Sequence, residues 1–184
     1  AARAVRLRAA SLGMETAQLS GGMRKRVGLA RALALRPGNV PALRSLGSGL
    51  VRLGRSAEGL DTLRSALRAD PADANSYLAL ALALRFVRGA ELEVIRLLRE
   101  ALARDPGAIA AMNELAWLRA TAADAALRDT SQALSISQRA LEQGGANDAG
   151  VLDTRAAALA SAGRLGEAIA VAGRALALAR GSGH

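Results

Sequence analysis

The residue types that carry most enzyme chemistry are scarce in this 184-residue sequence. It has no cysteine, and its only histidine is His184, at the end of the chain. There is therefore no thiol nucleophile or thiolate metal site, and a Ser/His/Asp triad cannot be assembled. The acid pairs Glu91/Glu93 and Asp70/Asp73 fall at predicted turns, where helix capping and solubility explain them. We expect no catalysis, no metal and no cofactor.

Positive charge is concentrated near the N-terminus. Residues 1–37 hold eight basic residues and one acid, so they carry +7 of the net charge of +9. Ser20 is expected to cap a helix that starts at Gly22 or Met23 and runs to Leu35. The asymmetry suits an anionic partner, and it equally suits a solvated helix face. We expect no nucleic-acid binding, because this region has no aromatic residue on which bases can stack.

The composition favours closely packed helices. Apolar residues make up 51% of the chain, mostly Ala, Leu and Val, and aromatic residues only 2%. We expect no transmembrane segment, because no uncharged run reaches 18 residues. No signal peptide is expected either, and the lack of cysteine fits a reducing compartment, so a cytoplasmic location is predicted. The sequence opens at Ala1 without an initiator methionine, as a fragment or a processed chain would.

Apolar periodicity and Gly/Pro punctuation predict helices joined by short turns along the whole chain. The connection after the sixth helix is longer, and the last four residues are expected to form a disordered tail. The expected helices span residues 22–35, 39–53, 57–69, 75–86, 92–103, 109–120, 129–143, 149–162 and 167–179.

A fixed period runs through these helices. Pro37, Pro71 and Pro106 are 34 and 35 residues apart, and each follows an alanine by five residues. That alanine recurs with gaps of 34, 35, 39 and 35 residues, at positions 32, 66, 101, 140 and 175. A hairpin unit of about 34 residues is the period of tetratricopeptide repeats. A generic Ala/Leu helical bundle is the alternative.

Residues 39–180 resemble the tetratricopeptide (TPR) family, with units at about 40–73, 74–108, 109–148 and 149–180. The large and small positions of the family pattern are occupied, in the first unit, by Leu43, Leu46, Gly47, Leu50, Gly54, Gly59, Leu63, Ala66 and Pro71. Gly59 stands where the family usually has alanine. The resemblance implies an all-α, right-handed solenoid of about four stacked hairpins with an N-terminal helical cap. It also implies a non-catalytic scaffold that binds a peptide or partner protein in the concave groove of the first helices.

The groove-facing positions of this pattern supply the expected partner-binding residues. They are Arg44, Ser48, Asn75, Arg85, Asn113, Trp117 and Asp153. Asn113 and Trp117 are one helical turn apart, so they share a face. Trp117 is the only tryptophan, and it either anchors a peptide or fills the space beside the longer third unit. Arg44 and Ser48 stand where Lys and Asn would clamp a peptide carboxylate in some TPR grooves.

A second resemblance covers residues 19–37, LSGGMRKRVGLARALALRP, which look like the signature segment of ABC-type ATPases. It implies that Ser20, Gly21 and Gly22 face a nucleotide phosphate bound to a complete partner subunit, as a helix N-terminus favours an anion. However, the chain has no G-x-x-x-x-G-K-[ST] loop, and no Asp-Glu-Pro strand follows Pro37. A fragment of, or fusion to, an ABC transporter subunit is therefore the alternative function, and the phosphate role is expected to be vestigial.

The same N-terminal residues also fit the repeat pattern. Counted back from Pro37, Leu29 and Ala32 stand where Leu63 and Ala66 stand in the next unit. Residues 1–38 are therefore predicted to pack as a degenerate end repeat, which is common where one face of an array meets water.

Overall fold

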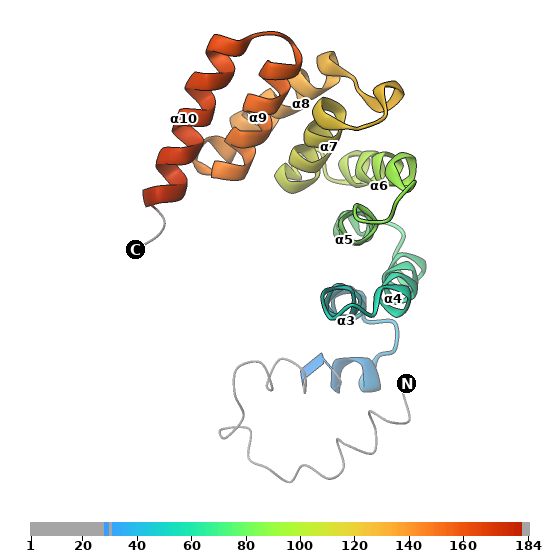
Figure 1. Ribbon diagram of the computed structural model, residues 1–184. Coiled ribbons are helices and arrows are strands. Elements are labelled where there is room, and N and C mark those ends of the chain that lie inside the picture. The colour runs from blue at the N-terminus through green and yellow to red at the C-terminus, as the bar shows by residue number, and fades with distance from the viewer. Residues whose placement is uncertain (1–27, 30, 182–184) are drawn as a thin grey trace. The chain divides into compact units, whose positions relative to one another are not determined.

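A computed structural model of the chain describes residues 28, 29 and 31–181, and every regular element in that part is a helix (Figure 1). The predicted all-α class is confirmed. The chain divides into two compact units, Ala1–Ala83 and Leu84–His184. The division falls at the end of α5 (Ala74–Leu84), inside the second predicted repeat.

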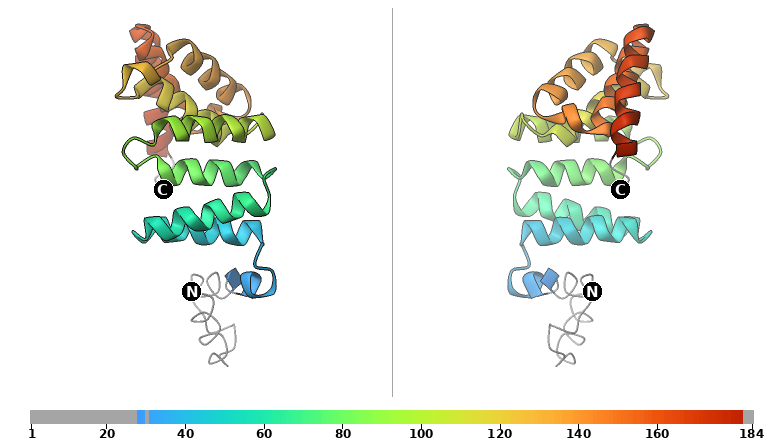
Figure 2. Two further views of the ribbon diagram at one scale, coloured as in Figure 1. Left: turned by 90° about the vertical axis from the view of Figure 1, so that its right-hand side faces the viewer. Right: turned by 90° about the vertical axis from the view of Figure 1, so that its left-hand side faces the viewer.

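The first unit contains the hairpin of α3 (Val40–Arg52) and α4 (Ser56–Ala69), which lie side by side (Figures 1 and 2). α3 begins after Asn39, whose side chain accepts a hydrogen bond from the backbone N–H of Ala42 at 3.0 Å. Asparagine is among the residues preferred at this N-cap position. The turn between the helices contains Gly54 at φ 79°, a left-handed conformation that glycine adopts without strain. Asn39 and Gly54 therefore fix the two ends of α3.

The two helices of this hairpin approach closely at Gly47 and Gly59. A Cβ on Gly47 would lie 2.9 Å from the carbonyl oxygen of Gly59, and one on Gly59 would lie 2.8 Å from the carbonyl oxygen of Gly47. Both distances are shorter than a carbon–oxygen contact allows. Glycine at position 59, where alanine is usual in the resemblance, therefore lets the backbones of α3 and α4 come together.

A charged contact at the start of α5 ties this helix to α3. Asp73, which directly precedes α5, accepts hydrogen bonds from Arg44 Nη1 at 2.6 Å and from Ser76 Oγ. Ser76 is fully buried. Burial raises the pKa of Asp73, but the Ser76 hydrogen bond and the Arg44 charge outweigh it and hold the pKa below its ordinary value. Asp73 is therefore a carboxylate that links α3 to the first turn of α5.

The second unit contains five α-helices. The first helix of each hairpin, α7 or α9, packs on the helices before and after it. The contacts join α6 to α7, α7 to α8 and α9, α8 to α9, and α9 to α10. The helices are α6 (Glu91–Arg104), α7 (Ile109–Thr121), α8 (Thr130–Glu142), α9 (Ala149–Ser161) and α10 (Leu165–Gly181), with two short 3₁₀ turns, η2 (Ala125–Leu127) and η3 (Gly145–Asn147).

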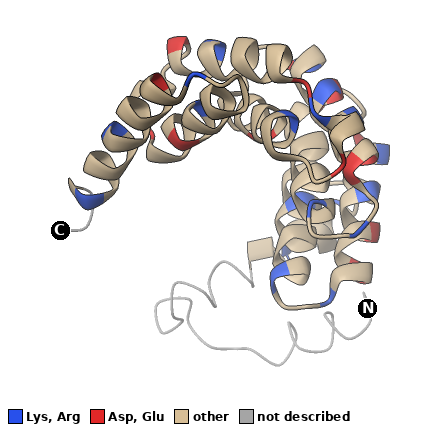
Figure 3. Cartoon of the chain, turned by 45° about the horizontal axis from the view of Figure 1, so that its top comes forward, with Lys and Arg blue, Asp and Glu red and all other residues tan. Residues whose placement is uncertain are grey.

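Four of the five alanines that define the period lie in the interior, and the fifth, Ala32, is half-buried. Ala66, Ala101 and Ala140 have no exposed surface, and Ala175 is buried as well. Larger buried side chains, among them Leu98 and Met112, fill the space between helices. Charged residues of both signs are spread over the outside of the helices (Figure 3). Small residues at the helix crossings and large ones between them are the arrangement that the repeat pattern predicted.

The longer connection between α7 and α8 is held by one arginine. Arg119 donates from Nε to the side-chain oxygen of Gln132 at 2.9 Å and from Nη1 to the carbonyl oxygen of Leu127 at 2.7 Å. The backbone N–H of Asp129 donates to the Arg119 carbonyl oxygen at 2.9 Å. Burial, together with the charge of Arg99, lowers the pKa of Arg119 below its ordinary value. The inserted residues are thus bound to both flanking helices.

Two predicted helix boundaries need correction. The helix expected over 75–86 ends at Leu84, because the chain turns through residues 85–89, with Gly89 at φ 80°. The helix expected over 167–179 is α10, which starts at Leu165 and continues to Gly181. Of the predicted N-terminal helix, residues 28, 29 and 31–35 are helical. Most of residues 1–38 lie outside the described part, so the end-repeat packing stays a prediction.

Candidate functional site

Trp117 lies on the surface of the second unit. It belongs to α7, and its side chain is 42% exposed, although tryptophan is usually well buried. Indole rings combine a large apolar surface with a hydrogen-bond donor, which makes an exposed one suitable for contact with another molecule. Its position on a first helix is the one that the repeat pattern predicted.

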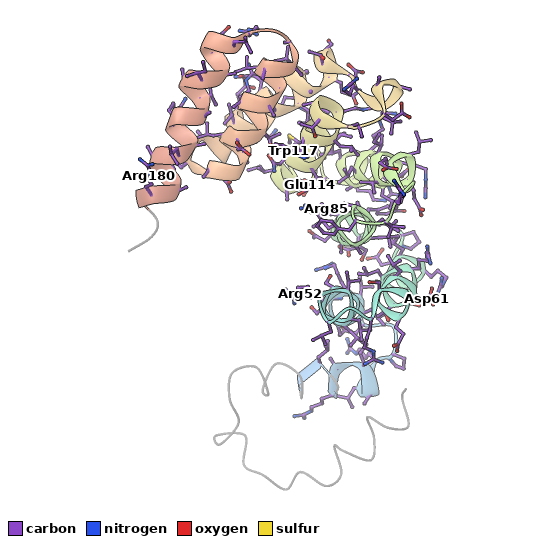
Figure 4. The ribbon with its side chains drawn as sticks, viewed as in Figure 1. Arg52, Asp61, Arg85, Glu114, Trp117 and Arg180 are labelled. Atoms are coloured by element: carbon purple, nitrogen blue, oxygen red, sulfur yellow. The ribbon has the colours of Figure 1, made fainter. Side chains whose placement is uncertain are left out.

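An ion pair includes a residue of the same helix as Trp117. Glu114, one turn earlier, pairs with Arg85 at 2.9 Å between Oε1 and Nη1. Arg85 in turn lies over the ring of Phe86, 4.6 Å from its centroid. Figure 4 shows Arg85, Glu114 and Trp117 on one side of the second unit. The ion pair is partly exposed, so it adds little stability, but it holds the side chains of Arg85 and Glu114 in a defined position.

Asn113, also one turn before Trp117, has an unusual environment. Its Oδ1 atom is buried and accepts no hydrogen bond. A buried acceptor without a partner costs about 1–3 kcal/mol. Because an amide can turn about its last side-chain bond, such a group is readily rearranged when a donor is offered. Asn113 is therefore the polar side chain of this face with an unmet hydrogen-bonding need.

The neighbouring first helix, α9, contributes one outward and one inward charge. Asp153 is exposed, and its assignment to the groove stays a prediction. Arg155 points into the unit instead, where Nη1 donates to the carbonyl oxygen of Leu134 at 2.8 Å and to Ser137 Oγ at 3.2 Å. Burial, aided by the charge of Arg164, lowers the pKa of Arg155 below its ordinary value. We define the Trp117 face as Asn113, Glu114 and Trp117 of α7 together with Asp153 of α9.

The other three predicted groove residues belong to the first unit. Arg44 is half-buried and pairs with Asp73, Ser48 is half-buried on α3, and Asn75 is exposed at the start of α5. Each unit thus has its own group of predicted residues: three in the first, and four (Arg85, Asn113, Trp117 and Asp153) in the second.

Sequence reasoning missed Glu114, Phe86 and Asp73. Glu114 precedes Trp117 by three residues, so the i,i+3 rule places both on one face of a helix. The sequence offered less indication of the role of Asp73, because its position at a turn was already explained by helix capping. Partners of Arg85 and Arg44 lie 29 residues away in sequence in both cases, and no local pattern predicts such pairs.

The described residues contain no group of three or more His, Asp or Glu side chains that could hold a metal ion. Within the same ranges no helix is long and apolar enough to cross a membrane. Ser20, Gly21 and Gly22, the residues of the predicted phosphate contact, lie outside the part of the chain that the structure describes.

Comparison with solved structures identifies the fold. A crystal structure of MamA superposes with a TM-score of 0.66 at 18% identity, covering 89% of this chain and 97% of that one. TTC0263 from Thermus thermophilus, described as a thermophilic TPR protein, gives 0.65 at 20% identity, covering 98% and 92%. YrrB, described as a TPR protein with an unusual peptide-binding site, gives 0.62 at 18% identity, covering 84% and 77%.

These similarities establish a fold of the tetratricopeptide type. No family model matches the sequence, and a search of curated proteins finds no match either. The resemblance of residues 19–37 to the ABC signature gains no support from these comparisons. At identities of 20% or less, the similarity concerns the architecture of the helical hairpins.

Proposed function

We propose that this chain is a non-catalytic protein-interaction scaffold that binds a peptide on the Trp117 face. The observation that carries the proposal is the exposure of Trp117 beside Asn113, whose buried oxygen lacks a donor. A TPR fold of which one member is described as having a peptide-binding site supports the same class of function. We also keep the cytoplasmic location and the anionic partner at residues 1–37 as predictions.

The chemistry of the face favours a particular kind of peptide. Trp117 offers an apolar surface that accepts an aliphatic side chain or, through its π-electrons, a Lys or Arg. Asp153 is an exposed carboxylate on the adjacent helix, whereas Glu114 is already neutralised by Arg85. A peptide with a basic residue next to an apolar one therefore matches this face. Asn113 would turn to pair with a backbone group of that peptide, since its amide offers both a donor and an acceptor.

The groove residues of the first unit are proposed as a second contact region. Asn75 is exposed and Ser48 is half-buried, so each still offers a polar group to a ligand. Arg44 is engaged with Asp73, so its role is to position the start of α5.

The experiment starts with selection of peptides from a random library by the purified full chain. Trp117 is the only tryptophan, so its fluorescence reports directly on occupation of the face. Selected peptides should be rich in Lys or Arg beside apolar residues and should shift the emission. Trp117→Ala should weaken binding about tenfold or more, since buried aromatic anchors dominate such interfaces. Trp117→Phe should lose less.

Leu92→Ala is the matched control. Leu92 is an exposed apolar residue at the start of α6, which is the second helix of its hairpin rather than a first helix like α7. It should leave the affinity unchanged. Equal binding by the wild-type chain and Trp117→Ala would contradict the proposal, as would selected peptides that bind without altering the emission.

A further inference from the structure

Two arginines of the second unit converge on one neutral oxygen atom. Arg99 of α6 donates from Nη2 to the side-chain oxygen Oε1 of Gln132 at 3.4 Å, and Arg119 of α7 donates from Nε to the same atom at 2.9 Å. Gln132 belongs to α8, so three helices bring these side chains together. A guanidinium group is matched best by a carboxylate or a phosphate, whose oxygens take its N–H donors in pairs. Here an uncharged amide oxygen occupies that place.

The positive charge of this pair is only partly offset in the part of the chain that the structure describes. There, neither Arg99 nor Arg119 forms an ion pair. Burial and, after it, the charge of Arg99 lower the pKa of Arg119, so the two cations are close enough to repel one another. Asp129 opposes this shift of the pKa, but its carboxylate accepts the backbone N–H of Gln132 at 2.8 Å and caps α8. The two arginines therefore exceed the one nearby carboxylate by a single positive charge.

Both arginines also retain unused hydrogen-bond donors, since a guanidinium group has five N–H bonds. Arg119 uses Nε and also Nη1, which donates to the carbonyl oxygen of Leu127. Arg99 uses Nη2 alone, in a bond long enough to be weak. Arg99 is exposed, whereas Arg119 and Gln132 are half-buried. The group is therefore open to solvent on the side of Arg99, and a ligand can reach it there.

We infer that Arg99, Arg119 and Gln132 form a binding site for a carboxylate of a peptide, supplied by an acidic side chain or by the C-terminus. A carboxylate has two oxygens, so each guanidinium group gains its own acceptor in place of the shared amide oxygen. Its single negative charge equals the excess positive charge of the group, whereas a phosphate monoester would bring about two. Gln132 can turn its amide and donate from Nε2 to the bound carboxylate.

This site is separate from the Trp117 face. Trp117 and Arg119 are two residues apart on α7, so their side chains leave the helix in different directions. The other members of the carboxylate site belong to α6 and α8, whereas the Trp117 face is built from α7 and α9. Carboxylate binding therefore does not depend on peptide binding at Trp117.

The test is a titration of the isotopically labelled full chain with small blocked compounds, followed by the NMR signals of the Nε–H groups of Arg99 and Arg119. Acetyl-glutamate amide offers a side-chain carboxylate, N-acetylglycine offers a terminal one, and acetyl-glutamine amide is the uncharged control. At least one carboxylate probe should shift both signals saturably, and the tighter of the two identifies the source of the carboxylate. Acetyl-glutamine amide should bind about tenfold more weakly or worse, because hydrogen bonds to charged groups are the stronger ones.

Two variants on one helix separate the site from general electrostatic attraction. Arg99→Gln should weaken binding about tenfold, because one of the two charged donors is lost. Arg99 is exposed and makes only the long bond to Gln132, so the variant should keep its fold. Arg96→Gln is the matched control, since Arg96 is exposed one turn earlier on α6 and its removal lowers the net charge equally. It should change the affinity by less than about twofold.

Three results would overturn the inference. The first is that neither carboxylate probe shifts both arginine signals. The second is equal weakening by Arg99→Gln and Arg96→Gln, since the attraction would then be unspecific. The third is tighter binding of inorganic phosphate than of both carboxylates, which would contradict the charge argument. Trp117→Ala should bind the probes as wild type does, whatever its effect on the peptides of the proposed function, and loss of probe binding in this variant would place the carboxylate on the Trp117 face instead.

Discussion

Replacing Gly47 by alanine tests whether the close crossing of α3 and α4 stabilises the first unit. The added Cβ would lie 2.6 Å from Leu63 Cγ and 2.9 Å from the carbonyl oxygen of Gly59. Leu63 has no exposed surface, so its side chain has little room to move. The Gly59 oxygen is backbone, so it can retreat only if the whole of α4 shifts away from α3.

Two opposing terms set the size of the effect. Alanine in a helix interior is favoured over glycine by about 0.5–1 kcal/mol. Overpacking a close contact costs about 1–3 kcal/mol. The contact with Gly59 is a backbone contact, so the cost falls in the upper part of that range. We expect Gly47→Ala to lower the free energy of unfolding of this hairpin by about 1–2 kcal/mol.

Gly49 provides a matched control on the same helix. A Cβ at Gly49 meets nothing within 4 Å, so Gly49→Ala gains helix propensity without a clash. It should stabilise α3 by about 0.5–1 kcal/mol. The two variants have the same composition and opposite predicted signs, so any effect of alanine on the unfolded chain cancels between them.

The measurement is urea unfolding followed by far-UV circular dichroism. Because repeat proteins often unfold in steps, hydrogen exchange of the α3 and α4 amides should accompany it as a local readout. The packing argument is refuted if Gly47→Ala is as stable as Gly49→Ala, since the crossing would then have accommodated a methyl group without cost.

Three other outcomes are expected. The lowered pKa of Asp73 stabilises the first unit at pH above about 3.8, the ordinary value, and this stabilisation is lost as the pH falls through the folded pKa. Asp73→Asn should therefore lower stability at neutral pH and flatten the acid limb of a pH titration of unfolding. Asp148→Ala should cost about 0.5–2 kcal/mol in thermal unfolding, because its Oδ1 caps α9 through the backbone N–H of Val151 at 3.1 Å. Leu98→Ala should cost about 2–5 kcal/mol in chemical unfolding, since Leu98 is fully buried.

The helical hairpins were predictable because their punctuation is local. Asn39 caps α3, and Gly54 and Gly163 take left-handed conformations at φ 79° and 74° in the turns where the sequence pattern places them. The recurring alanine also fixed the register of the second helices, and Ala101 and Ala140 are indeed fully buried. Caps, turns and helical periodicity act over a few residues, so they can be read without a structure.

The candidate site was only partly predictable, because side-chain direction depends on the space that other helices leave. Trp117 was assigned to a groove position, but its degree of exposure did not follow from the sequence. Arg155 looked like any surface arginine, yet it points inward to the carbonyl oxygen of Leu134. The pairing of Arg85 with Glu114 likewise depends on which helix packs beside which. Such facts come from packing between repeats rather than within them.

The connection between α7 and α8, residues 122–129, has a practical consequence. Arg119 fastens it to Gln132 and Leu127, yet the spacing of 39 residues between Ala101 and Ala140 leaves both alanines buried. Extra chain length at this point is therefore absorbed outside the helix contacts. An epitope tag or a dye-bearing cysteine introduced into this connection should therefore leave the fold intact. A protease, in contrast, should cleave this connection slowly, and replacement of Arg119 should make the cleavage faster.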